Sequence, residues 1–471
     1  MEGHTAVWCA RIAGIATLLV SAAATAGRIE IGAVTIQDTF AVPTATRVTF
    51  LEPFDVTPVV VSIPTNQGGD PAVVRISNIS RFGFDVVQTE PSANDGPHVA
   101  MDTAYIAVEP GEHTLPGGAR IIALTRATTS TVSRITGQSW DLVSFATPFA
   151  SAPAVVTAVQ TMRNESGSPP ATASTPLLAV AVRNVNAAGF DLALERAEST
   201  AGSVTLPETI GIIAIDNNTT ATLVDTNGNT AELQALITPN NIEGFNDGCF
   251  TNSFNSAFTA TPLVVASMVT RNGGNGGWLR RCSLGAASVG LSVDEDIDTD
   301  TERNHIDETA AVVAASRAFH ANLGVRLSIA KNVAVTSDPV NGASNPFAIP
   351  GATVRYEIDV SNAGATSPDG NSLIVDDAIP TELAMCVSTA CFGDAPVAFD
   401  DSASPIPTGM AIAGVAYSND NGASFAYTPT PDADGYDAAI TDVRVTLSGT
   451  LPGIASSGAP RFALRIVAEV N

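Results

Sequence analysis

The stretch Phe50-Leu51-Glu52-Pro53-Phe54, followed by Pro58 and Val59-Val60-Val61, decides the fold of this chain because its pattern occurs three times. The spacing of two phenylalanines and a proline returns at Phe145, Phe149 and Pro153, and again at Phe254, Phe258 and Pro262. Each copy runs into a stretch rich in valine, which is typical of a strand buried against a sheet. The sequence therefore predicts one structural module in three copies.

Two further phrases keep the same order in the copies. A strand ending in Asn78 precedes Gly83-Phe84-Asp85, a strand ending in Asn184 precedes Gly189-Phe190-Asp191, and Val289-Gly290-Leu291-Ser292 is a weaker third copy. Each copy then closes on an apolar strand, at 103–109, 208–215 and 308–315. We predict modules at 27–126, 127–222 and 223–322, and a fourth domain of different sequence at 323–471.

The composition indicates the fold class. Clusters of Gly, Pro, Asn and Asp separate short runs of Val, Ile, Thr and Phe, which is typical of antiparallel sandwiches. A chain with 45% hydrophobic and 15% charged residues is a packed protein and not a disordered acidic tail. We predict an all-β chain of tandem antiparallel β-sandwiches, with one helix over Thr230–Ile237 linking the second module to the third.

The N-terminus is typical of a secretory signal. Arg11 precedes an apolar run that ends at Ala24-Thr25-Ala26, a set of small residues suited to processing ahead of Gly27. Residues 1–26 are therefore predicted to be a signal peptide, and the mature chain to be secreted or held at the cell surface. The alternative, a membrane-spanning segment, is disfavoured because the run is short, and no later stretch is apolar enough to span.

Four cysteines remain once Cys9 is removed with the signal, and an exported chain keeps disulfides. Local pairing predicts Cys249 with Cys282 and Cys386 with Cys391. Buried free thiols are the alternative.

Charge and motifs exclude several functions. The formal net charge of -25 repels phosphate backbones, so nucleic acid is not an expected partner. The chain has no HExxH, no GxSxG and no histidine pair at metal spacing, so we do not expect an enzyme. His98 and His305 both precede a closing strand and are interpreted as surface residues.

The last domain resembles the immunoglobulin-like repeat domain of bacterial surface proteins, which has a Pro-Gly turn, a V-x-Y-x-I-x-V strand, N-x-G and a D-x-I-P turn. The matching residues are Val354, Tyr356, Ile358, Val360, Asn362, Gly364, Asp377, Ile379 and Pro380. The resemblance implies a spacer or stalk module.

The three modules resemble the H-type lectin family of small six-stranded sandwiches. In the first module the matching residues are Phe50, Phe54, Pro58, Arg75, Gly83, Phe84, Tyr105, Ala107 and Glu109. The resemblance implies recognition of N-acetylgalactosamine-type sugars, and because such lectins assemble as trimers it implies that the three modules pack around a pseudo-threefold axis. A further oligomer of the whole chain is also an expectation.

The family's sugar positions are not kept in the first two modules, where Pro71, Pro91, Leu177 and Ala197 stand instead. Arg75 and Arg183 lie out of register and are interpreted as solvated. In the third module, Trp278, Arg280 and Arg281 come just before the Val289 strand and are the candidate carbohydrate site, with Trp278 stacking on the sugar. The alternative is that Trp278 belongs to the core.

Calcium is the cofactor that three oxygen-rich loops would suit, because it binds six to eight hard oxygens. The candidate ligands are Asp225, Asn227 and Asn229, the run from Asp294 to Asp300, and Asp432, Asp434 and Asp437. The alternative is that these are turn residues.

These observations together predict a secreted or surface-associated bacterial binding protein that recognises a glycan or cell-surface polysaccharide in adhesion. The alternative function is a structural component of the cell surface or matrix without sugar-binding activity.

Overall fold

The computed structural model describes residues 16–20, 27–39, 44–91, 93–94, 98–134, 138–165, 176–199, 201–392 and 395–471. The chain divides into two compact units. We call Gly27–Leu323 the repeat unit, and Gly324–Asn471 together with Ala16–Val20 the C-terminal unit. The rest of the predicted signal peptide, including Cys9 and the processing site, lies outside the described residues.

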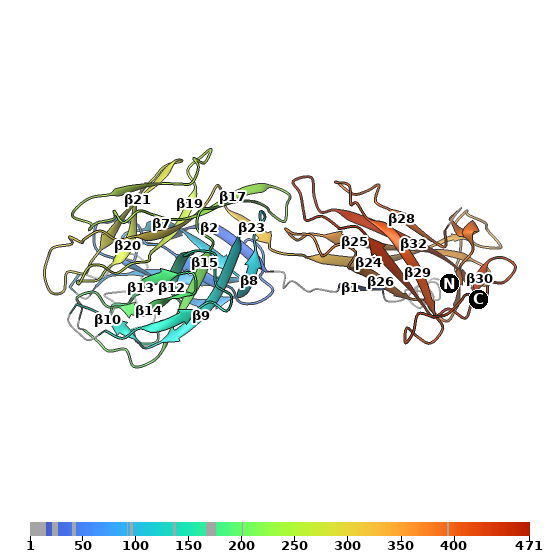
Figure 1. Cartoon of the computed structure of the whole chain (residues 1–471), viewed down its shortest axis with the longest axis horizontal. Coiled ribbons are helices and arrows are strands. Elements are labelled where there is room, and N and C mark those ends of the chain that lie inside the picture. The colour runs from blue at the N-terminus through green and yellow to red at the C-terminus, as the bar shows by residue number, and fades with distance from the viewer. Residues whose placement is uncertain are drawn as a thin grey trace. The chain divides into compact units, whose positions relative to one another are not determined.

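The predicted fold class is confirmed: the regular structure of the described residues is β-strand, apart from a 3-10 turn at Thr389–Cys391 (Figure 1). The described part of the chain contains no helix long and apolar enough to cross a membrane. The predicted helix is wrong, because Thr230–Ile237 is strand β17, paired on both sides by β16 (Thr219–Val224) and β22 (Ala310–Ala315). Pairing on two edges outweighs the modest helix propensity of its Ala, Glu and Leu residues.

Each module is built from two small sheets that share one plan. The first module has β2 (Arg28–Ile36), β7 (Met101–Val108) and β4 (Val59–Ser62) in one sheet, and β3 (Thr46–Thr49), β6 (Gly83–Thr89) and β5 (Val73–Ser80) in the other. The second has β9 (Arg120–Thr128), β15 (Glu208–Ile215) and β12 (Ala154–Val159), then β11 (Asp141–Ser144), β14 (Gly189–Glu195) and β13 (Ala179–Asn186), with β10 (Thr131–Val132) beside β14. The third has β17, β22 and β19 (Leu263–Met268), then β18 (Phe250–Ser253), β21 (Ser288–Asp294) and β20 (Trp278–Leu284).

The modules exchange strands in a closed cycle. β8 (Gly111–Thr114) follows the closing strand of the first module but pairs with β9 of the second. β16 follows the closing strand of the second module and pairs with β17 of the third. β23 (Phe319–Asn322) follows the closing strand of the third module and pairs with β2 of the first. The predicted module limits at 126 and 222 consequently fall inside β9 and β16.

A shared axis lies among β4, β12 and β19, because each of these equivalent strands contacts the other two. The valines of β4 and β12 and Val265 of β19 belong to one hydrophobic cluster that draws on all three modules. The modules therefore pack around a common centre, as the expected pseudo-threefold arrangement requires.

The repeated phenylalanines form one aromatic pair in the core of each module. The ring centroids of Phe50 and Phe54, of Phe145 and Phe149, and of Phe254 and Phe258 lie 4.8, 4.8 and 5.2 Å apart, edge to face. Edge-to-face contact is a favoured geometry for aromatic pairs, so the spacing that repeats in the sequence is a spacing that core packing demands.

The C-terminal unit is a separate two-sheet structure with its own core. One sheet contains β24 (Leu327–Ser337), β25 (Thr353–Asn362), β32 (Arg461–Val470), β27 (Leu383–Cys386) and β30 (Tyr436–Asp437), with β28 (Val397–Asp400) also on β32. The other contains β1 (Ala16–Val20), β26 (Leu373–Ala378), β31 (Asp442–Ser448) and β29 (Ala411–Ser418). As predicted, Val354, Tyr356, Ile358 and Val360 alternate inward along β25.

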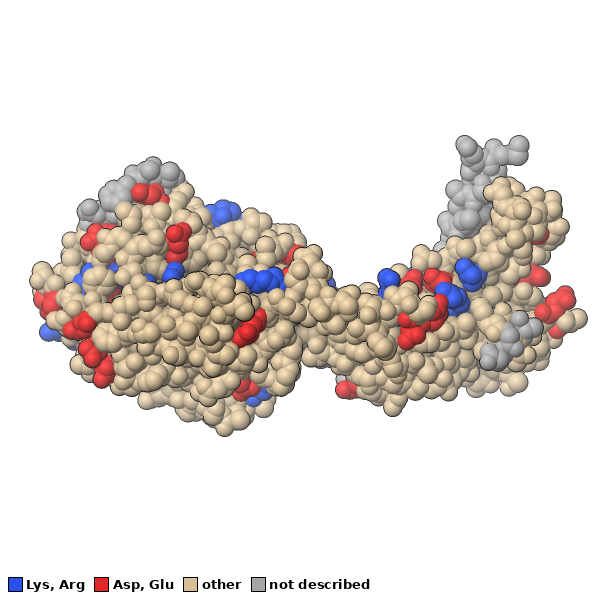
Figure 2. Space-filling model, turned by 90° about the horizontal axis from the view of Figure 1, so that it is seen from above, with Lys and Arg blue, Asp and Glu red and all other residues tan. Residues whose placement is uncertain are grey.

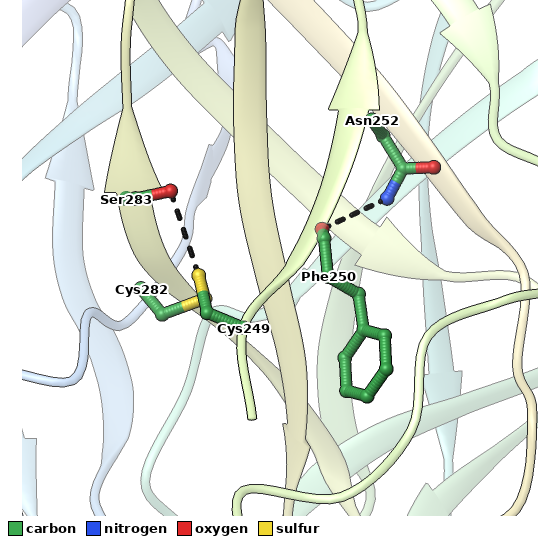
Figure 3. Close-up of a disulfide and its surroundings, with 5 residues drawn as sticks. All are labelled: Cys249, Phe250, Asn252, Cys282 and Ser283. Carbon is green, nitrogen blue, oxygen red and sulfur yellow. Dashed lines mark hydrogen bonds between the residues drawn. A yellow bond between two sulfur atoms is a disulfide. The ribbon is translucent and has the colours of Figure 1, made fainter. Parts of the chain in front are cut away.

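Both predicted disulfides are formed. Cys249 and Cys282 join the start of β18 to β20 with 5.9 Å between their Cα atoms, and the hydroxyl oxygen of Ser283 lies 3.5 Å from the Cys249 sulfur (Figure 3). Cys386 and Cys391 have Cα atoms 6.2 Å apart. Both Cα separations lie within the range that a disulfide spans.

Candidate functional site

The structure places the predicted carbohydrate residues at the joint between the third module and the first. Trp278 is 5% exposed, and its indole Nε1 donates to the carbonyl of Ala72, 2.9 Å away. Arg280 is fully buried, and its guanidinium donates to the carbonyls of Thr65 and Asp70 and to the Asp294 carboxylate. Two of the three predicted side chains are thus occupied within the protein and face no solvent.

Arg281 belongs to the same joint. Its Nη2 donates to the carbonyl of Asp102, 2.8 Å away, and burial lowers the pKa of its guanidinium. Trp278 is therefore buried, as the alternative interpretation of it as a core residue expects. The three residues together hold the third module against the first.

Equivalent joints connect the other modules. In the paired strands, Arg75 stands opposite Val87 as Arg280 stands opposite Ser292, so the two arginines occupy one position of the module. Arg75 is buried in an ion pair with Glu165 of the second module, which corrects its interpretation as a solvated residue.

The joint between the second and third modules uses a third buried pair. Arg271 Nε lies 2.6 Å from a carboxylate oxygen of Glu195, and both side chains are buried. Because a buried ion pair costs desolvation and loses its compensation when one partner moves, such pairs favour one arrangement of the modules over others. Sequence reasoning missed the Arg75–Glu165 and Arg271–Glu195 pairs, since each joins residues of different modules. Arg280 pairs with Asp294 of its own module and reaches the first module through the carbonyls of Thr65 and Asp70.

A titratable cluster lies in the third module around His305. Its ring nitrogens lie 2.7 Å from Glu295 and 3.2 Å from Glu308. Burial alone lowers the pKa of His305, but the hydrogen bonds to both carboxylates outweigh it and raise the pKa to about 9. His305 and His98 are buried, so the interpretation of both as surface residues is wrong.

Asp296 lies where the third module meets the second. Its carboxylate accepts the backbone N–H groups of Glu198 and Ser199 at 2.8 and 3.2 Å. Burial raises the pKa of Asp296 to about 6. Like His305, it is committed to hydrogen bonds within the protein.

A small cavity lies near the shared axis. It has a volume of about 60 Å³ and is lined from all three modules, including Ser62, Thr157, Ser267 and Arg75. A space of this size holds a few water molecules and no sugar ring.

The predicted calcium ligands are turn residues that bond their own loops. Asp225 accepts the backbone N–H groups of Asn227 and Asn229 and pairs with Arg317. Asp432 accepts the N–H groups of Asp434 and Tyr436 in the same way.

The remaining predicted ligand is also engaged, because Asp437 accepts from Tyr427 and from the backbone N–H of Thr430. Among the residues that the structure describes, no three His, Cys, Asp or Glu side chains are grouped to hold a metal ion. In the acidic run from Asp294 to Asp300, Asp294 pairs with Arg280, and Asp296 accepts the backbone N–H of Glu198.

A polar and aromatic cluster lies on the second sheet of the second module. We call Trp140, Arg183, Asn184 and Asp191 the Trp140 cluster. The Arg183 guanidinium stacks 4.0 Å from the centre of the Trp140 ring. Its Nε and the amide of Asn184 donate to one oxygen of Asp191, at 3.2 and 2.8 Å.

The cluster is positioned by a bulge in strand β13 between Arg183 and Asn186. Asn184 takes a φ of 56° there, a left-handed conformation that asparagine tolerates better than most residues. The bulge turns Arg183 and Asn184 toward Asp191 on the neighbouring strand β14. Arg183 keeps 37% and Asp191 25% of the side chain exposed, so the cluster is accessible.

The other modules hold only part of this cluster. In the first, Asn78 bonds Asp85 at 2.7 Å and Arg47 comes from β3, and no aromatic ring of the described residues lies over Arg47. In the third, Gly290 stands where the aspartate would be and Ser283 stands opposite it, beside the disulfide (Figure 3). The second module alone therefore combines the ring, the guanidinium and the carboxylate.

Figure 2 shows how charged side chains are distributed on one face. On the face shown in Figure 2, acidic and basic side chains are interspersed among a larger area of other residues.

The chain matches no known family model, no curated protein and no solved structure.

Proposed function

We propose that this protein is an exported, surface-associated binding protein, in which the lectin-like repeat unit recognises a glycan and the immunoglobulin-like C-terminal unit is a spacer. The disulfides are compatible with an extracellular location, since disulfides persist there. Processing after Ala26 remains part of this proposal.

The observation that carries the proposal is the Trp140 cluster. Protein sites for sugars combine an apolar aromatic surface with fixed hydrogen-bonding groups that replace the water on sugar hydroxyls. Here the Arg183 guanidinium lies over the Trp140 ring and Asp191 accepts from two donors, so donors and acceptors are fixed before a ligand arrives. Leu142 lies opposite Asp191 on β11 and is 66% exposed, which adds apolar surface beside the polar groups.

The charge of the chain limits the ligand class. A net charge of -25 repels an anionic polysaccharide at low ionic strength, so we propose a neutral glycan. Titration calorimetry of the full chain with galactose-type sugars and neutral oligosaccharides tests this.

We expect Trp140→Ala and Arg183→Ala each to weaken binding about tenfold, the size of a loss of about 1 to 2 kcal/mol of stacking and charge-assisted contact. Arg47→Ala is the matched control, because the first module has the same Asn and Asp without the ring. Equal affinities of all three variants would contradict the proposed site.

A structural role is the second candidate, and the buried ion pairs between modules favour it. The buried pairs of Arg75 and Arg271 join different modules, as expected of a building block whose rigidity matters more than its ligand. Arg280 joins the third module to the first through hydrogen bonds to backbone carbonyls. Absence of any glycan binding by the wild-type chain would leave this candidate in place.

A further inference from the structure

The edge of strand β26 in the C-terminal unit differs from the other sheet edges of that unit. In the structure, β26 is covered by β1, in an antiparallel ladder that runs from Ala16 opposite Asp377 to Val20 opposite Leu373. β1 lies within the segment that the proposed processing after Ala26 removes. The mature protein then has β26 as an edge strand.

The end strands of the two sheets, β24, β29 and β30, carry devices that prevent edge-to-edge pairing. β24 has a bulge between Val335 and Ser337, β29 has a bulge between Ile412 and Gly414, and β30 is only two residues long. Bulges and short strands are the usual protection of sheet edges. β26 contains no bulge, lysine or proline, and its pairing with β31 on the inner side is continuous from Ile374 to Ala378.

The charges on β26 do not prevent pairing either. Asp376 is held by Arg444 in two contacts of 2.7 and 2.6 Å. Asp377 is buried and lies 2.7 Å from Lys331 Nζ. Both carboxylates are therefore neutralised within their own unit, and an incoming strand meets an apolar Leu373-Ile374-Val375 segment.

We propose that β26 of the mature chain pairs with β26 of a second copy, edge to edge and antiparallel, so that the leader strand β1 occupies this edge only until it is removed. This inference rests on the processing included in the proposed function, but not on glycan binding.

The charges of β26 disfavour registers that bring its aspartates together. Pairing centred on Ile374 places Leu373 opposite Val375 of the second copy on the inner face, and it places Asp376 opposite Ser372. Moving the centre to Asp376 would bring two like charges opposite each other, which is unfavourable in an antiparallel pair. A second copy fits this edge because a twofold axis lets the same apolar strand serve as both partners.

Sedimentation equilibrium tests the proposal by comparing the full chain with the chain that begins at Gly27. We expect the shortened chain to double its mass as concentration rises and the full chain to keep the mass of one copy. A soluble peptide with the sequence of Ala16–Val20 should return the shortened chain to one copy. Circular dichroism verifies that the shortened chain is folded.

Two lysine variants of the shortened chain give the matched control. Ile374→Lys places two lysines at the centre of the contact and should abolish the dimer, whereas Ile412→Lys on the bulged β29 edge should leave it intact. If Ile374→Lys does not fold, competition by the peptide decides instead. A mass of one copy at all concentrations, or a dimer that survives both the Ile374→Lys change and the peptide, would overturn the proposal.

Peptide binding without a dimer would show a strand-accepting edge with another occupant and would overturn the second copy as its partner. N-terminal sequencing of the exported protein separates the two proposals. A chain that retains residues 1–26 refutes the processing, while a chain that begins at Gly27 and stays single refutes the pairing.

Discussion

Raising the pH from 6 to 9.5 should destabilise the repeat unit through His305. The imidazole is buried between Glu295 and Glu308, and these carboxylates favour its protonated form. The folded pKa of about 9 lies above the ordinary histidine pKa of 6.5 that applies to the unfolded chain. A group with a raised folded pKa stabilises the fold fully below its unfolded pKa, and that stabilisation is lost as the pH rises through the folded pKa.

The size of the effect follows from the difference between the two pKa values. Each pKa unit corresponds to about 1.4 kcal/mol, so a rise from 6.5 to about 9 gives a loss on the order of 3 kcal/mol across this pH range. Burial lowers the pKa of His305, and the loss of stability at high pH arises because the two carboxylates outweigh this effect.

Urea unfolding followed by tryptophan fluorescence measures this loss of stability in the repeat unit. The chain has three tryptophans, of which Trp8 lies in the predicted leader and Trp140 and Trp278 lie in the repeat unit. The His305→Gln variant keeps one amide donor but has no charge to lose. We expect it to be less stable than the wild type at pH 6 and to approach the wild type at pH 9.5. Two parallel stability curves would refute the reasoning.

Two further predictions concern the joints and the cross-links. Arg280→Met should destabilise the repeat unit by about 3 kcal/mol, because it leaves the buried Asp294 with only Arg303, and the double variant with Asp294→Leu should recover part of the loss in the same urea assay. Replacing Cys249 and Cys282 by serine should cost about 3 to 4 kcal/mol, since that bond closes a loop of 33 residues, whereas replacing the pair five residues apart should cost only about 2 kcal/mol; equal losses in the two units would argue against loop closure as the cause.

The core of each module could be predicted from the sequence because its determinants are local. The spacing of Phe50 and Phe54 sets one aromatic pair, and the β-branched run after Pro58 sets the strand that reaches the shared axis. The alternation from Val354 to Val360 likewise follows directly from strand geometry. Local placement was also sufficient for the disulfides.

The joints could not be predicted in the same way. Trp278 and Arg280 have the residue types of a sugar site, but a loop of the first module, more than 200 positions earlier in the chain, covers them and binds their polar atoms. Arg183 is interpreted as solvated because it lies out of register with the family's sugar position, whereas the structure gives it Asp191 and the ring of Trp140 as partners beside the bulge in β13. Thr230–Ile237 shows the same limit, since its strand state depends on two partners that local propensity does not include.

The three modules that exchange strands in a cycle belong to one chain, so equivalent positions in them need not hold the same residue. In an assembly of three identical chains, any substitution appears at every joint at once. Here the position held by Arg75 and Arg280 is Ala181 in the second module, and the aspartate of the Trp140 cluster has become Gly290 in the third. One chain can therefore keep the Trp140 cluster in a single module while the other two modules hold different residues at the equivalent positions, without any change in the number of modules.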